Sequence, residues 1–348
     1  VLGGIGIQSI NVDVNVANFF KPGTEIRDSM DFMDREMSGT LDLRVRLEAD
    51  VRDPQILNKI DSLQTFIQKN ENISVTYSIT DIVKQMHRTV MNDSLKYESI
   101  PSTREKVNNL FTMYYMSGNH DELASIIDHE NKTTLITSLS SIMSTEDVFS
   151  LVESMKIYIK DHFYDPDKIS ITGMIVVIRD MVLMVIRSSL LSISISIILI
   201  AFIITLFFRR VIWGVLSIIP LFSAVILNFG LMGHFNITLN HITAILSSII
   251  IGVGVDFAIH YISQFQKLSK TIKEKNITMA VVKDVGYPIL LDAGSNMGFG
   301  ALIFSVFLPV QHIGGLMVFA MISTSLGTLT LLASSTQLLS NHVSKRES

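Results

Sequence analysis

The chain has 348 residues, a formal net charge of −4 and no cysteine. The absence of cysteine excludes a disulfide framework, thiol chemistry and a cysteine-based metal site. Mild acidity without a basic stripe argues against nucleic acid as a partner. No nucleophile, phosphate-binding loop or metal-ligand spacing of histidines stands out, so we expect no enzyme activity, no bound metal and no cofactor.

Charge divides the chain into a polar first part and an apolar second part. Most of the 28 Lys+Arg and 32 Asp+Glu side chains lie before residue 188. We interpret the apolar residues 1–10 as the end of a membrane helix that starts upstream of Val1, with a processed N-terminus or a buried strand as the alternative. Residues 11–187 would then form an extracytoplasmic domain, 188–340 a transmembrane domain and 341–348 a cytoplasmic tail.

Strand and helix patterns alternate through the polar part. Residues Thr40–Val51 alternate apolar and polar side chains, as a half-buried strand does. The elements that follow are a helix from Pro54 to about Asn70, a strand over Ile73–Thr80, a helix capped by Asp81, helices over Ser102–Met116 and Asp121–Ile127, a strand over Lys132–Ser141, a helix over Thr145–Asp161, a strand over Ile169–Thr172, and a helix over Met174–Arg187 that runs into the first membrane span. Two β-α-β units in tandem predict an α+β domain of ferredoxin-like type, with the helices over one face of the sheet.

The apolar part contains five stretches of the roughly 20 residues that a membrane-spanning helix needs. They are Ser188–Phe208, Val211–Met232, His241–Phe265, approximately Pro288–Leu308, and Val310–Leu339. Basic residues after position 187 gather at Arg209 and Arg210, in the loop from Lys267 to Lys283, and in the tail. Since Lys and Arg accumulate on the cytoplasmic side, the tail is expected inside and residues 11–187 outside. The predicted fold is a five-span helical bundle with an extracytoplasmic α+β domain.

Asp256 is the one Asp, Glu, Lys or Arg between Asn240 and Gln266, inside the third predicted span. An ionisable side chain at membrane depth is costly and therefore indicates a functional site. Gly252 and Gly254 remove side-chain bulk just before it, so we expect neighbouring helices to approach and enclose the carboxylate. His260 lies four residues on, along the same side of the helix, and could pass protons onward; an interfacial polar role is the alternative.

Other polar residues of the apolar part are weaker candidates. Asp292 is placed about one turn into the fourth predicted span, where a helix-start role is as plausible as a functional one. Asn228 and Asn296 are expected as hydrogen-bond partners of a buried carboxylate, and Gly298 as a packing position. The alternative for Asp256 is a buried polar residue that only holds helices together.

Several motifs occur together: Gly252, Gly254, Asp256, His260 and Tyr261 lie in the third span, Phe208–Arg210 follows the first, residues 233–240 precede the third, and Gly298–Leu302 with Ser305 lie in the fourth. By these motifs and the order of its parts, the chain resembles the C-terminal half of RND superfamily transporters, in the branch of MMPL-like and hydrophobe/amphiphile exporters, which are also similar to Patched-type proteins. The resemblance implies that Asp256 carries protons and that a second acid lies in a half that this chain does not contain. Phe257 stands where the MMPL-like branch commonly has a tyrosine, which puts an Asp-Tyr pairing in doubt.

By this resemblance we expect export of hydrophobic or amphiphilic molecules, such as lipids or drugs, across a bacterial inner membrane by proton-driven alternating access. The expected partners are membrane lipids, the substrate, and a missing N-terminal half or a second half-transporter, including a homo-oligomer. The alternatives are a Patched-like protein that senses or scaffolds lipid, and a SecDF-like protein that uses protons to assist protein translocation.

Overall fold

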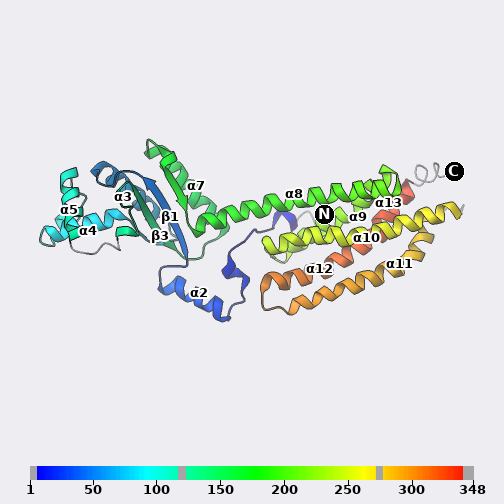
Figure 1. Ribbon diagram of the computed structural model, residues 1–348. Helices are drawn as coiled ribbons and strands as arrows, with labels where there is room; N and C mark the ends of the chain where they lie inside the picture. Colours follow the sequence, from blue (N-terminus) through cyan, green and yellow to red (C-terminus); the bar gives the residue numbers. More distant parts are fainter. Residues whose placement is uncertain (1–5, 117–122, 272–276, 340–348) are drawn as a thin grey trace. The chain divides into compact units, whose positions relative to one another are not determined.

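The computed structural model describes residues 6–116, 123–271 and 277–339. The chain divides into two compact units (Figure 1). The first comprises Val1–Lys21 and Val182–Ser348, and the second comprises Pro22–Met181. They are called the bundle and the outer unit below. The start of the predicted helix Asp121–Ile127 and the predicted tail lie outside the described residues.

The outer unit contains a four-stranded sheet of β1 (Leu41–Glu48), β2 (Ile73–Tyr77), β3 (Thr133–Ser140) and β4 (Ile169–Thr172). The strand order is β2-β3-β1-β4, and every neighbouring pair is antiparallel. The two strands of each β-α-β unit are therefore not neighbours, because a strand of the other unit lies between them. The predicted alternation is observed in β1, whose Leu43 and Val45 are fully buried.

Helices α3 (Pro54–Gln68) and α7 (Thr145–His162) supply the helical side of this core. Both begin at a polar N-cap, since Asp53 accepts from the backbone of Gln55 and Ser144 accepts from that of Asp147. The helices lie side by side, with the rings of Phe66 and Tyr158 stacked 4.3 Å apart. Both predicted helices are confirmed within two residues at each end.

Three further helices of the outer unit are α2 (Glu25–Glu36), α4 (Ile79–Val90) and α5 (Arg104–Met116). The pattern analysis did not predict α2, which buries no residue of its own. Ser78 is the N-cap of α4, and Asp81 closes a capping box from the third helical position. The prediction of Asp81 as the cap itself was therefore wrong, because the helix starts two residues earlier.

Four helices among the described residues are long and apolar enough to cross a membrane. They are α8 (Met174–Phe208), α9 (Val211–His234), α10 (His241–Thr271), and a run over Leu308–Leu338 made of α12 (Leu308–Gly327), a π-helical turn (Thr328–Leu332) and α13 (Ala333–Leu338). The prediction that a helix from Met174 continues into the first span is confirmed by the unbroken α8.

The fourth predicted span differs from its expected form. Instead of one helix over Pro288–Leu308, the chain forms α11 (Ile277–Asn296) and then a 3₁₀-helix (Met297–Phe304). Lys283, Asp284 and Asp292 all lie in α11, so this helix is less apolar than α8 and α9. The sequence prediction assigns Lys283 to a basic loop, and the helix therefore begins earlier than expected.

Candidate functional site

Helix α10 packs against its neighbours along one side. Gly254, Phe257, Ala258 and Tyr261 are buried there. A Cβ atom at Gly254 would lie 2.7 Å from Cδ2 of Leu221 in α9 and 3.0 Å from Cγ2 of Thr324. Both distances are shorter than ordinary van der Waals contact, so the glycine allows α9 and α12 to approach α10 closely.

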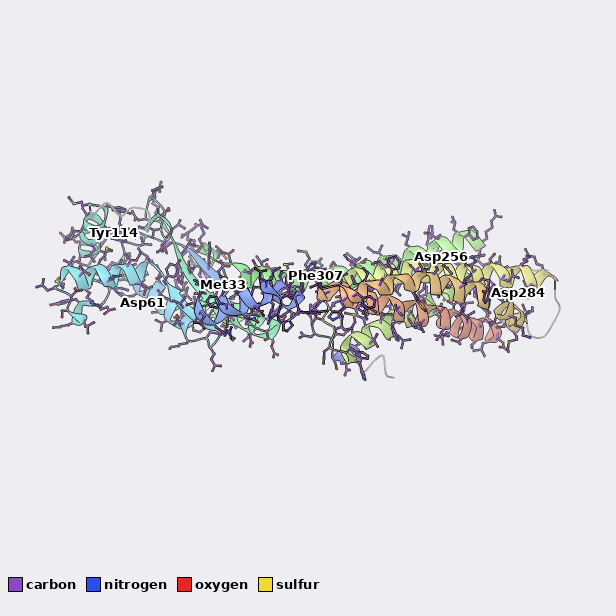
Figure 2. All side chains as sticks on the ribbon, turned by 90° about the horizontal axis from the view of Figure 1, so that it is seen from below. Met33, Asp61, Tyr114, Asp256, Asp284 and Phe307 are labelled. Atoms are coloured by element: carbon purple, nitrogen blue, oxygen red, sulfur yellow. The ribbon has the colours of Figure 1, made fainter. Side chains whose placement is uncertain are left out.

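Asp256, which is labelled in Figure 2, is exposed on the side of α10 away from Gly254. It follows Gly254 by two residues, which is about 200° around a helix of 3.6 residues per turn. Gly252, Asp256 and His260 are all exposed, and their four-residue spacing places them in one stripe. Among the described residues, none forms a hydrogen bond or an ion pair with Asp256 or His260.

The expectation that this chain encloses the carboxylate of Asp256 was therefore wrong for the described residues, among which Asp256 is exposed. The helices that come close at Gly254 cover the face of α10 opposite Asp256. On the flank, α10 meets α8 through a hydrogen bond of 2.8 Å between the hydroxyls of Ser248 and Ser192. Within the described part of the chain, the stripe of Gly252, Asp256 and His260 remains exposed.

Asn228 lies in α9, away from the level of Asp256. Leu221 marks where α9 meets Gly254, and Asn228 is seven residues further on, about 10 Å along the helix. Its Nδ2 atom donates to the carbonyl of Ala224 at 3.3 Å. Its buried Oδ1 atom has no hydrogen-bond partner among the described residues. The structure thus does not bring Asn228 to Asp256.

Asp292 and Asn296 are brought together in the last turn of α11. Nδ2 of Asn296 donates to Oδ1 of Asp292 at 3.2 Å and to its carbonyl at 3.1 Å. Asp292 follows the helix start at Ile277 by 15 residues, about 22 Å along the axis. The placement of Asp292 one turn from a loop was therefore wrong, because the helix begins 11 residues before Pro288.

A hydrogen bond between α10 and α11 relates the depths of Asp256 and Asp292. Nε2 of Gln264 donates to Oδ2 of Asp284 at 2.7 Å. The two helices run antiparallel in Figure 1, so eight residues back along α10 and eight forward along α11 lead to Asp256 and Asp292. Because the rise per residue is the same in both helices, the two carboxylates lie at similar depth in the bundle.

The glycines divide into close contacts and open positions. A Cβ at Gly300 would lie 2.8 Å from Cγ2 of Val318, whereas a Cβ at Gly252 or Gly298 would meet no described atom within 4 Å. Of the predicted packing positions, Gly254 makes a close contact, whereas Gly252 and Gly298 make none with described atoms; Gly300 also makes a close contact. Side-chain identity alone does not distinguish a glycine that faces a neighbour from one that faces outward.

Tyr261 is a buried polar residue to which the sequence reasoning gave no role. Its hydroxyl hydrogen-bonds the hydroxyl of Thr336 in α13 at 2.8 Å, which ties α10 to the end of the last helix. The signal available in the sequence was a tyrosine among apolar residues, since a buried phenol needs a partner.

No group of three or more potential metal ligands occurs among the described residues.

Comparison with known proteins places these features in a family. The model of the MMPL family matches residues 45–348. A protein of Methanocaldococcus jannaschii whose name describes it as a membrane protein is 22% identical over 287 residues, which are 81% of this chain and 71% of that protein. The family match begins inside β1 and extends through the bundle, so it includes the sheet and the helix that carries Asp256.

Proposed function

We propose that this chain, which belongs to the MMPL family of RND-type membrane transporters, exports hydrophobic or amphiphilic molecules with energy from the proton-motive force. The observation that carries the proposal is the uncovered position of Asp256 on a helix apolar enough to span a membrane. An ionisable group at membrane depth faces protein or a water-filled cavity far more often than lipid, because lipid does not solvate charge.

The Asp256 stripe is proposed to be covered by helices that are not part of the described chain. They would come from a further segment of the same protein, from a second half-transporter or from a second copy of this chain. Gly252 supports this assignment, because it leaves open space beside the carboxylate into which a partner helix fits. A covering helix with its own acid would complete the relay.

The proposed coupling step is the gain and loss of a proton on Asp256. With the proton bound, the carboxyl is neutral and can move against an apolar neighbour. With the proton lost, the charge requires hydrogen-bond donors or water. His260, one turn further along the same stripe, would exchange protons with the cytoplasmic side. Asp292, paired with Asn296 at similar depth, is the second carboxylate that could share the proton.

The membrane arrangement belongs to the same proposal. Helix α11 and its 3₁₀ extension together would make the fourth of five spans, with α11 supplying most of the length. By the distribution of basic residues, the C-terminus would lie in the cytoplasm and the outer unit on the opposite side of the cytoplasmic membrane. The strand order β2-β3-β1-β4 supports a ferredoxin-like porter domain, whose movement would release the substrate outward by alternating access.

The test is Asp256→Asn in the whole protein, reconstituted in vesicles with and without an imposed pH gradient. A fluorescent long-chain fatty acid serves as the transport probe. The variant is expected to lose the gradient-dependent part of the transport while keeping its fold, since asparagine has the same shape but cannot titrate. Asp284→Asn is the matched control, because it changes a bundle carboxylate whose contact is a hydrogen bond from Gln264. Gradient-driven transport that survives in Asp256→Asn would remove Asp256 from the mechanism.

A further inference from the structure

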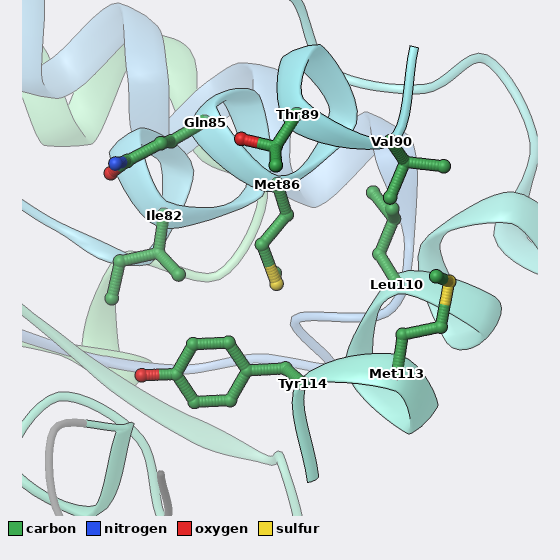
Figure 3. Close-up of a pocket in the computed structure, with 8 residues that line it drawn as sticks. All are labelled: Ile82, Gln85, Met86, Thr89, Val90, Leu110, Met113 and Tyr114. Atoms are coloured by element: carbon green, nitrogen blue, oxygen red, sulfur yellow. The ribbon is translucent and has the colours of Figure 1, made fainter. Parts of the chain in front are cut away.

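Helices α4 and α5 of the outer unit frame an apolar groove far from Asp256 in the sequence. Its cavity has a volume of about 310 Å³. The lining side chains come from two segments and are Ile82, Gln85, Met86, Thr89, Val90, Leu110, Met113 and Tyr114. In Figure 3, Ile82 and Met86 of α4 point toward Tyr114 of α5, with Leu110 and Met113 beside them.

The groove is open to the outside and lined by adaptable side chains. Leu110 is only 5% exposed and forms its floor, whereas Val90 and Met113 are 45% and 52% exposed at its edge. Methionine has a flexible, polarisable side chain that fits ligands of varying shape. An opening of this kind between two packed helices differs from a sealed packing defect, because a ligand can enter from solvent.

A polar pocket borders the groove along α4. It has a volume of about 280 Å³, and Gln85 and Thr89 line it as well as the groove. Its other lining residues are charged and are Asp81, Lys84, Arg88, Asp93 and Glu98. These charges are partly paired, since Nη1 of Arg88 lies 3.3 Å from Oε2 of Glu98 and Nζ of Lys84 lies 2.5 Å from Oδ1 of Asp61. Both signs of charge are present.

We infer that the α4–α5 groove binds one alkyl chain of an amphiphile whose polar head lies across Gln85 and Thr89 in the neighbouring pocket. The contiguity of an apolar groove and a charged pocket matches a molecule with one apolar and one polar end. Because both acidic and basic side chains line the pocket, a zwitterionic or hydrogen-bonding head group is favoured over a simple anion. The volume of the groove is at the lower end of the range for small-molecule sites.

The choice of an amphiphile as the ligand rests on the proposed function, but binding here would need neither the gradient nor Asp256. The site would hold the molecule in the outer unit as a step separate from proton exchange. Two kinds of variant therefore separate ligand binding in the groove from proton coupling at Asp256. One blocks the groove, and the other removes the Asp256 carboxyl.

The experiment is photolabelling of the whole protein in detergent, without a pH gradient. The probe is a dodecyl chain with a terminal diazirine and a zwitterionic head. Met86→Trp is expected to fill the groove and lower labelling severalfold, and Met113→Glu is expected to lower it by placing a charge at the half-exposed edge. Met37→Trp is the control, since Met37 is 60% exposed outside the groove. Mass spectrometry should locate the label in residues 79–90 or 104–116.

The inference is overturned if the label lies outside these segments, or if both groove variants label as strongly as the unchanged protein while remaining folded by circular dichroism. Asp256→Asn should label normally. Normal labelling with transport that does not depend on Asp256 would leave the groove in place and remove the proposed coupling. Gradient-driven transport that depends on Asp256, without labelling of the groove, would overturn the groove as a binding site and leave the proposed coupling in place.

Discussion

Apolar side chains are arranged in opposite ways in the outer unit and in the bundle. In β1, Leu43 and Val45 are fully buried while Arg44 and Arg46 face outward. In α8 many of the exposed side chains are apolar, and Ile198 and Leu199 are exposed by 68% and 54%. Only 6% of the most apolar window of α8 is buried inside the chain.

This difference in the burial of apolar side chains follows from the solvent around each unit. In water, removing apolar surface drives the sheet and helices together. In lipid that force is absent between helices, and close packing and hydrogen bonds hold them instead. The bundle uses small residues such as Gly254 and hydroxyls such as Thr324, which donates to the carbonyl of Ala320 at 2.6 Å. An exposed leucine is therefore ordinary in α8, whereas the exposed carboxylate of Asp256 requires an explanation.

The largest expected effect comes from removing a core side chain of the outer unit. Leu43→Ala should destabilise that unit by about 2–5 kcal/mol, because the side chain is fully buried and leaves a cavity. Leu199→Ala in α8 is the control and should change stability little, since its side chain contacts lipid before and after unfolding in the membrane. Hydrogen exchange of the sheet amides measures the first change. Equal losses in both variants would contradict the comparison.

The next effect tests close approach within the bundle. Gly254→Val should destabilise the helical packing by about 1–3 kcal/mol, because the new side chain overlaps Leu221 and Thr324. A Cβ atom at Gly252 would meet no described atom within 4 Å, so Gly252→Val should leave thermal unfolding in detergent unchanged. If a partner helix covers the Asp256 stripe, Gly252→Val should nevertheless reduce transport. Full activity of that variant would argue against a close partner there.

The smallest expected effect concerns the start of α4. Ser78→Ala removes an N-cap whose hydroxyl accepts from the backbone of Thr80 and also donates to Oε1 of Gln64 at 2.6 Å. A loss of about 0.5–2 kcal/mol is expected, measured by chemical denaturation of the outer unit within the whole protein. Ser74→Ala, at an exposed position of β2, is the control and should have no measurable effect. An effect of Ser74→Ala as large as that of Ser78→Ala would show that the cap is not responsible.

Local patterns predicted the elements well where one periodicity dominates. The alternation in β1, the starts of α3 at Pro54 and of α7 at Thr145, and the long apolar runs of α8, α9 and α10 depend on neighbouring residues, so they can be predicted without the fold. Helix α2 was missed because its short polar sequence buries nothing. The predicted start of α11 was too late, because charged residues in the first turns of a helix give the same sequence pattern as a charged loop.

The sequence by itself determined that Asp256 is a lone charge in an apolar helix and that two kinds of solvent surround the chain. Only the tertiary structure decided which side of α10 that charge occupies, since Gly252 and Gly254 are equivalent in composition and differ only in what packs against them. It also decided that Asp292 pairs with Asn296 at the depth of Asp256, because depth depends on where α11 begins. The residue type determines the chemistry of a side chain, but the elements that pack around it determine whether it is enclosed.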